Sequence, residues 1–148
     1  MEKIENLKKL KEDYEVLRKK YELPKFEKFN TEFNLESIQT LDTEFLARRL
    51  RLLIDIRVGN ILSWLEGFMN PQRATVLMFE IINNLKEEEK QVLKEIYSEL
   101  GELKIDAWKI ELLPYNEENE IRLVKDSIKK FDKIKIRLQK IIEKMDRK

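Results

Sequence analysis

Apolar residues recur at intervals of three and four positions along most of the chain, which is the spacing of one face of an α-helix. The first such stretch covers residues 1–21 and forms one stripe: Ile4, Leu7, Leu10, Tyr14, Leu17 and Tyr21. Pro24 follows, and proline lacks a backbone donor and restricts the residue before it. The pattern therefore predicts an amphipathic helix over residues 1–21.

The next segment, residues 22–41, loses the regular helical spacing but remains apolar. It contains three of the seven phenylalanines, and its apolar residues are Leu23, Phe26, Phe29, Phe33, Leu35 and Ile38. A disordered linker is normally poor in aromatic residues. We therefore predict an irregular aromatic strap that lies across a helical bundle and can include a short helical turn.

A second helix is predicted over residues 42–69. Asp42 is a suitable N-cap, and Leu41 can pack on Leu46 as a hydrophobic staple. The apolar positions nearly encircle this helix: Phe45, Leu46, Leu50, Leu52, Leu53, Ile54, Ile56, Val58, Ile61, Leu62, Trp64, Leu65 and Phe68. Because a helix that is apolar almost all round is normally buried, we expect it to be the central helix.

Two further helices are predicted before residue 114. Asn70 and Pro71 should end the second helix and begin a short apolar one, since proline suits the first helical position. Asn84 and Glu87 resemble a capping box at the start of a fourth helix. That helix carries Val92, Ile96, Leu100, Leu103, Ala107 and Ile110 at helical spacing. Pro114 should close it.

The last helix, predicted over residues 116–148, begins with Asn116 as N-cap. Its apolar residues fall on heptad a and d positions, interrupted by Lys135: Ile121, Val124, Ile128, Phe131, Leu138, Ile142 and Met145. The sequence thus predicts an all-α protein, an elongated bundle of about five helices with long second, fourth and C-terminal helices. We expect one domain over residues 1–148: an amphipathic helix (1–21), an aromatic strap (22–41), a helical core (42–113) and a basic heptad-like helix (116–148).

Charge divides the chain more sharply than its near-neutral total suggests. The chain has 30 Lys and Arg against 29 Asp and Glu, but residues 122–148 hold 11 against 4. On a helical wheel, one face of the last helix carries eight basic side chains: Arg122, Lys125, Lys129, Lys133, Arg137, Lys140, Lys144 and Arg147. Such a face can contact phosphates, anionic lipid or an acidic protein surface, or it can simply be solvated.

Composition restricts the available chemistry. The chain has no His and no Cys, so nucleophilic systems that need either residue cannot form. We expect no enzyme activity, no cofactor and no metal site. The N-terminus lacks the apolar core of a signal peptide, and no run of about 18 apolar residues occurs. A cytoplasmic location without a transmembrane segment is therefore expected.

Two groups of charged residues in the predicted core allow sharper hypotheses. Arg48, Arg51 and Asp55 share one strip of the second helix and predict an internal salt-bridge network, with an anion-binding cluster as the alternative. The fourth helix carries an acidic side with Glu88, Glu95, Glu99, Glu102 and Asp106. Clustered carboxylates of this kind can hold Mg²⁺.

Residues 99–103, ELGEL, resemble the second metal motif of the all-helical MazG-type nucleotide pyrophosphatases. The resemblance implies a Mg²⁺-dependent nucleotide pyrophosphatase. It covers five residues, and the family also needs a paired-Glu motif on the preceding helix. Residues 71–85 offer only Glu80, and Glu102 stands where the family has aspartate.

Two functional hypotheses follow from these patterns. The first is a non-catalytic interaction or scaffold protein that binds a protein partner, or forms a homo-oligomer, through its heptad-like helices. The second is an accessory protein that binds nucleic acid through the basic face of the last helix. Salt distinguishes them, because phosphate binding weakens steeply with salt whereas an apolar seam does not.

Overall fold

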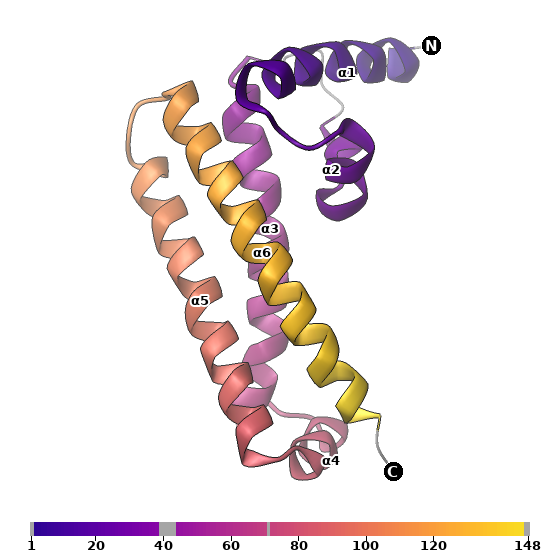
Figure 1. Ribbon diagram of the computed structural model, residues 1–148, viewed down its shortest axis with the longest axis vertical. Helices are drawn as coiled ribbons and strands as arrows, with labels where there is room; N and C mark the ends of the chain where they lie inside the picture. The colour runs from indigo at the N-terminus through magenta and orange to yellow at the C-terminus, as the bar shows by residue number, and fades with distance from the viewer. Residues whose placement is uncertain (1, 39–43, 71, 147–148) are drawn as a thin grey trace.

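The computed structural model describes residues 2–38, 44–70 and 72–146, and this part of the chain is all-helical, as predicted (Figure 1). Its elements are α1 (Glu2–Tyr21), α2 (Phe26–Phe33), the 3₁₀ turn η1 (Leu35–Ser37), α3 (Leu46–Met69), α4 (Val76–Asn84), α5 (Glu87–Glu111) and α6 (Glu117–Met145). The described residues thus form six α-helices, one more than the predicted five. The predicted long second, fourth and C-terminal helices are α3, α5 and α6.

The three long helices lie side by side and make the body of an elongated bundle (Figure 1). Each of α3, α5 and α6 contacts the other two, and α3 also contacts α1, α2 and α4. The prediction that this helix is central is therefore confirmed. α1 crosses one end of the bundle, and α4 lies at the opposite end. Among the helices described, none has both the length and the hydrophobicity needed to cross a membrane.

The additional helix is α2, in the segment predicted as an irregular strap. Phe26, Phe29 and Phe33 are spaced by three and four residues and are all buried on one face. Their rings continue the contacts of Tyr14 on α1, with ring centroids 5.7 Å from Tyr14 to Phe29 and 5.1 Å from Phe29 to Phe33. The ring centroid of Phe33 in turn lies 5.4 Å from that of Phe131 on α6. The aromatic rings on one face of α2 therefore link the core residues of α1 to those of α6.

α3 begins later than predicted and is not buried all round. It starts at Leu46, after Phe45 in a left-handed conformation (φ 59°). The predicted cap Asp42 and staple residue Leu41 lie outside the described residues. Neighbouring helices cover only part of its circumference, so Ile56 on the outer side is 60% exposed.

Local side-chain chemistry explains where the remaining helices start. Thr75, rather than Asn70, caps α4 by accepting a hydrogen bond from the backbone of Met78 (3.2 Å). At α5, the Glu89 carboxylate accepts from the Lys86 backbone (2.9 Å), so the predicted Asn84–Glu87 capping box is wrong by two positions. The predicted cap of α6 is confirmed, because Asn116 Oδ1 accepts from the Asn119 backbone (3.0 Å).

In the C-terminal half of α6, one of the two heptad positions lies one residue earlier than predicted, whereas Phe131 and Leu138 are buried as predicted. Ile134 and Ile141 are buried where the predicted register had Lys135 and Ile142, and Ile142 is exposed. The buried positions keep heptad spacing: Val124, Ser127, Phe131, Ile134, Leu138 and Ile141. Lys135 instead forms an ion pair with Glu32 on α2 (2.7 Å). The seam faces α3 and α5 of the same chain and is therefore already occupied.

Candidate interaction surfaces

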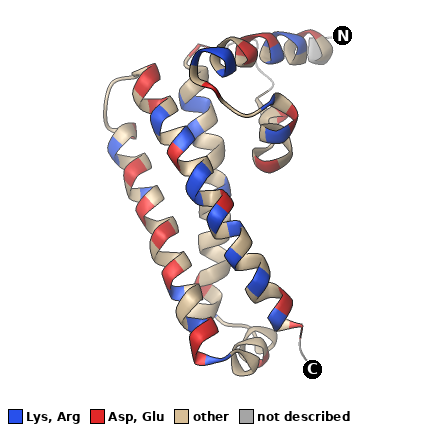
Figure 2. Ribbon diagram, viewed as in Figure 1, with Lys and Arg blue, Asp and Glu red and all other residues tan. Residues whose placement is uncertain are grey.

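The basic residues predicted on α6 and described by the structure fall into two groups: some pair with acidic residues of α5, and the others face solvent. Lysines and arginines run along α6, and acidic residues of α5 lie opposite its C-terminal half (Figure 2). Arg137 forms ion pairs with Glu99 (2.5 Å) and Glu95 (3.3 Å), and Lys144 lies 3.5 Å from the Glu89 carboxylate. Two of the eight predicted basic residues, Arg137 and Lys144, thus hold α6 against α5.

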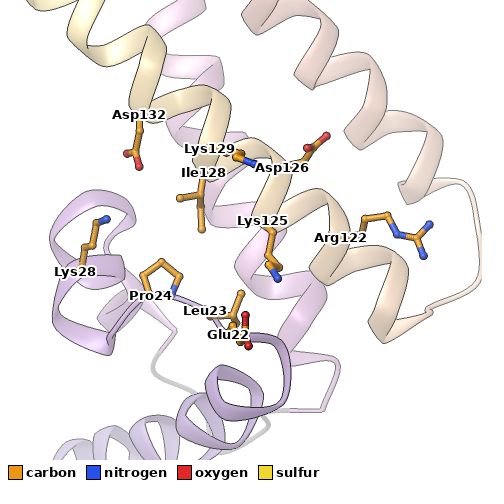
Figure 3. A pocket seen from close by; sticks show the side chains of 10 residues that line it. All are labelled: Glu22, Leu23, Pro24, Lys28, Arg122, Lys125, Asp126, Ile128, Lys129 and Asp132. Atoms are coloured by element: carbon orange, nitrogen blue, oxygen red, sulfur yellow. The ribbon is translucent and has the colours of Figure 1, made fainter.

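The rest of the predicted stripe remains solvent-facing. The exposed members are Arg122, Lys125, Lys129, Lys133 and Lys140, whereas Arg147 lies outside the described residues. Three of them, Arg122, Lys125 and Lys129, line a groove of about 640 Å³ beside the α1–α2 connection. Lys125 is directed toward Leu23 of that connection, whereas the Arg122 side chain extends away from it (Figure 3).

This basic groove combines cations with an apolar floor. Lys28 of α2 joins Arg122, Lys125 and Lys129 of α6 at its edges, and these four side chains form no ion pair with another described residue. Leu23, Pro24 and Ile128 supply apolar surface, and Glu22, Asp126 and Asp132 also line the groove. Asp126 forms an ion pair with Lys130, with 3.6 Å between Oδ2 and Nζ. With Asp126 paired, the lining carries these four cations against Glu22 and Asp132, a formal excess of two positive charges that can face an anion.

Contacts of α1 fix the backbone that forms one wall of the basic groove. The Tyr14 hydroxyl donates a 2.6 Å hydrogen bond to the Pro24 carbonyl. Tyr21 donates to the Glu117 carboxylate at 2.7 Å, and Lys20 does so at 3.0 Å. The hydrogen bond from Tyr21 lowers the pKa of Glu117 below its usual range. These bonds tie the end of α1 to the start of α6.

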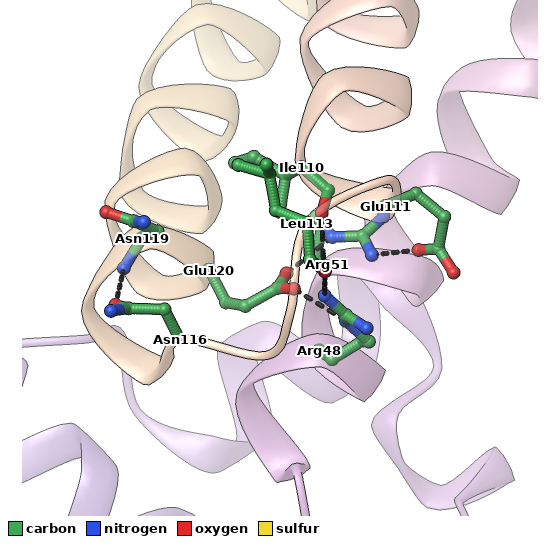
Figure 4. Close-up of polar contacts among 8 residues, drawn as sticks. All are labelled: Arg48, Arg51, Ile110, Glu111, Leu113, Asn116, Asn119 and Glu120. Atoms are coloured by element: carbon green, nitrogen blue, oxygen red, sulfur yellow. Dashed lines mark hydrogen bonds and ion pairs between the residues drawn. The ribbon is translucent and has the colours of Figure 1, made fainter.

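A buried cluster of arginines and glutamates joins α3, α5 and α6 near one end of the bundle. Figure 4 shows Arg48 and Arg51 converging on Glu120. Arg48 Nε lies 2.7 Å and Arg51 Nε 2.5 Å from the two carboxylate oxygens of Glu120, whose side chain is 0% exposed. Arg51 also pairs with Glu111, and Arg48 donates to the Leu113 carbonyl (3.1 Å).

Electrostatics within this cluster favour the charged forms. Burial alone would lower the pKa of Arg51, but the hydrogen bonds to Glu111 and Glu120 outweigh it, so the pKa is raised. The hydrogen bond from Arg51 lowers the pKa of Glu111. The predicted internal network is confirmed for Arg48 and Arg51. Asp55 is not a member, because it pairs with Lys104 instead (3.2 Å).

The acidic residues predicted along one side of α5 differ in their surroundings. Glu95 and Glu99 face Arg137, whereas Glu88 and Glu102 are exposed. In the described ranges, no group of three or more acidic side chains could hold a metal ion. Glu80, on α4, is exposed as well. The ELGEL segment therefore contributes one partner of the α5–α6 ion pairs and one solvent-facing carboxylate.

The outer surface between α3 and α5 was not among the sites predicted from the sequence. A groove of about 680 Å³ lies there, named here the α3–α5 groove, lined by Ile56, Gly59, Asn60, Leu62, Ser63, Glu66, Tyr97, Gly101, Lys104, Ile105 and Trp108. Ile56 and Trp108 are each 60% exposed and Ile105 is 48% exposed. A signal for it exists in the sequence: Tyr97, Gly101, Ile105, Trp108 and Leu112 form a second stripe on α5, beside its core stripe.

No family model, no curated protein and no solved structure matches the chain.

Proposed function

We propose that the chain is a non-catalytic interaction protein that binds another polypeptide through the α3–α5 groove. The observation that carries the proposal is the row of large apolar side chains left open there, above all Ile56, Ile105 and Trp108. Single exposed apolar residues are ordinary, but a contiguous apolar patch with polar edges is typical of an interaction site.

The arrangement of the core supports this location over the heptad seam of α6. That seam packs against α3 and α5, so it offers no free apolar face. The α3–α5 groove lies instead between two helices whose outer sides are uncovered. Fully burying one large apolar side chain contributes roughly 1.5–3 kcal/mol. Ile56, Ile105 and Trp108 are about half exposed, so covering each contributes about half of that value.

A photo-reactive phenylalanine analogue placed at Trp108 tests this function in cells that express the protein. We expect covalent adducts with a second polypeptide after irradiation, because Trp108 protrudes into the proposed interface. The change Ile56→Asp in the same chain should reduce the adducts at least about tenfold, since a charge in an apolar interface costs more than 1.4 kcal/mol.

The matched control carries the same analogue at Ile136, which is exposed on α6 outside the α3–α5 groove. Adducts that are equally abundant at both positions, or that persist with Ile56→Asp, would contradict the proposal. Mass spectrometry then identifies the adduct partner, which is either the same chain or another protein.

A second candidate function is the binding of a polyanion such as nucleic acid through the basic groove. The specific observation in its favour is that Lys28, Arg122, Lys125 and Lys129 lie around one groove without an ion pair to another described residue. Such cations can contact phosphates and release counterions, which gives salt-dependent affinity.

The triple change of Arg122, Lys125 and Lys129 to Gln tests this second function. We expect the variant to bind a fluorescent oligonucleotide more weakly, with the slope of log affinity against log salt smaller by about two to three units, or ~0.7–0.9 per phosphate contact. The control changes the exposed Arg57, Lys94 and Lys109 to Gln and removes the same charge. Equal slopes for the two triple variants, or no binding by the unmodified protein at low salt, would refute polyanion binding in this groove.

A further inference from the structure

We propose that the occupant of the α3–α5 groove is a second copy of the same chain, which docks across a two-fold axis with α5 antiparallel to its counterpart. The proposal rests on the proposed function, because it names the polypeptide that the groove binds.

The charges of the groove are compatible with self-association. Its charged lining residues are Glu66 and Lys104. Lys104 pairs with Asp55 at 3.2 Å, and Glu66 pairs with Arg73 at 2.8 Å and accepts from the Tyr97 hydroxyl at 3.2 Å. Both charges are thus neutralised within the chain. A neutral surface does not require a strongly charged partner and does not repel its own copy.

The size of the groove surface suits a dimer. The groove stripe of α5 runs from Tyr97 to Trp108, and the exposed Leu112 just beyond the end of α5 extends it. Together they span 15 residue steps, or about 23 Å at ~1.5 Å per residue, and two helices side by side are about 20–24 Å wide. The surface therefore measures roughly 500 Å² in projection. Two copies that covered this whole surface would bury about 1,000 Å² in total, which is the lower bound for a specific interface.

The groove also contains a protrusion and a hollow that can match each other reciprocally. Trp108 is 60% exposed, and Gly101 lies seven residues before it on the same stripe, about 10.5 Å along the axis. A Cβ atom added to Gly101 would meet no atom within 4 Å, so packing within the chain does not explain this glycine. Glycine inside a helix is unfavourable relative to alanine, whereas it permits close approach of another chain.

A two-fold axis perpendicular to α5 and midway between these residues places Trp108 of each copy over Gly101 of the other. This is the reciprocal relation that an isologous interface requires. Ile105 then lies next to the axis, facing its own counterpart. Helices that pack 8–10 Å apart bring such facing Cα atoms within about 4–6 Å.

Sedimentation velocity of the full chain tests the dimer directly. We expect a species of twice the 18.0 kDa chain mass at micromolar concentration. Ile56→Asp should weaken dimerisation at least about tenfold, the effect of a disrupted interface anchor. The matched control is Ile136→Asp, which changes an isoleucine of similar exposure (56%) on α6 and should leave the dimer intact.

Gly101→Gln separates loss of the dimer from loss of the fold. Glutamine is a far better helix former than glycine and has open space at this position, so the monomer should melt at a higher temperature. The same side chain fills the hollow that receives the partner's tryptophan. We expect dimerisation to weaken at least about tenfold although the chain is more stable. A Gly101→Gln variant that dimerises as tightly as the unmodified chain would refute the arrangement.

Cysteine cross-linking tests the position of the axis, because the chain contains no cysteine of its own. Ile105→Cys should give a disulfide-linked dimer on mild oxidation, since the facing Cα atoms lie within disulfide range. Ile136→Cys should remain monomeric on a denaturing gel. Equal cross-linking of the two variants, or a monomer at every concentration, would overturn the self-association proposal. In the monomer case, photo-adducts at Trp108 with a different protein would still support the proposed interaction function.

Discussion

Glu120→Gln is expected to lower the free energy of unfolding by about 3–5 kcal/mol, the cost of breaking a buried ion pair by removing one partner. Glu120 is fully buried and accepts from both Arg48 and Arg51. An amide keeps the size of the side chain but removes its charge and one of its two acceptor oxygens. Arg51, which is 3% exposed, would then depend on Glu111 alone for a negative charge.

Urea unfolding followed by circular dichroism measures this loss. The matched control is Glu118→Gln, two residues earlier in α6, where the carboxylate is exposed. It removes the same charge from the first turn of the helix and should cost at most about 1 kcal/mol, the usual contribution of a charge to the helix dipole. Similar losses for the two variants would mean that the buried cluster contributes little beyond helix capping.

The helical body was predictable because its cues are local. Spacing of apolar residues places α3, α5 and α6, and Asn116 caps the last helix as predicted. Local patterns were insufficient where the same residues fit either a helix or an irregular segment. Phe26, Phe29 and Phe33 have helical spacing, but the segment is only eight residues long, and so short a helix is stable only through tertiary packing.

The surfaces were less predictable because they depend on which elements meet. A helical wheel correctly groups Arg137 and Lys144 with the exposed cations of α6. It cannot show that both reach acidic residues of α5, which are distant in the sequence. Likewise, the apolar ring of α3 indicates burial, but only the placement of its neighbours shows that the side bearing Ile56 is left uncovered.

The second large effect is expected on α3, where two isoleucines two positions apart occupy opposite environments. Ile54 is 3% exposed in the core and Ile56 is 60% exposed in the α3–α5 groove. Ile54→Ala should lower the free energy of unfolding by about 2–5 kcal/mol, the sum of lost burial and the cavity left behind. Ile56→Ala removes the same atoms from a mostly hydrated site, so the isolated chain should lose less than about 1 kcal/mol.

Urea unfolding at two protein concentrations distinguishes these roles. At a concentration low enough to dissociate the proposed dimer, the difference between the two variants should be largest, because only Ile54 packs inside one chain. At high concentration the unmodified chain gains stability from association, and Ile56→Ala should lose much of that gain. Equal losses for the two variants in dilute solution would place Ile56 in the core of the single chain. Its side chain could then not serve as an anchor for a second copy.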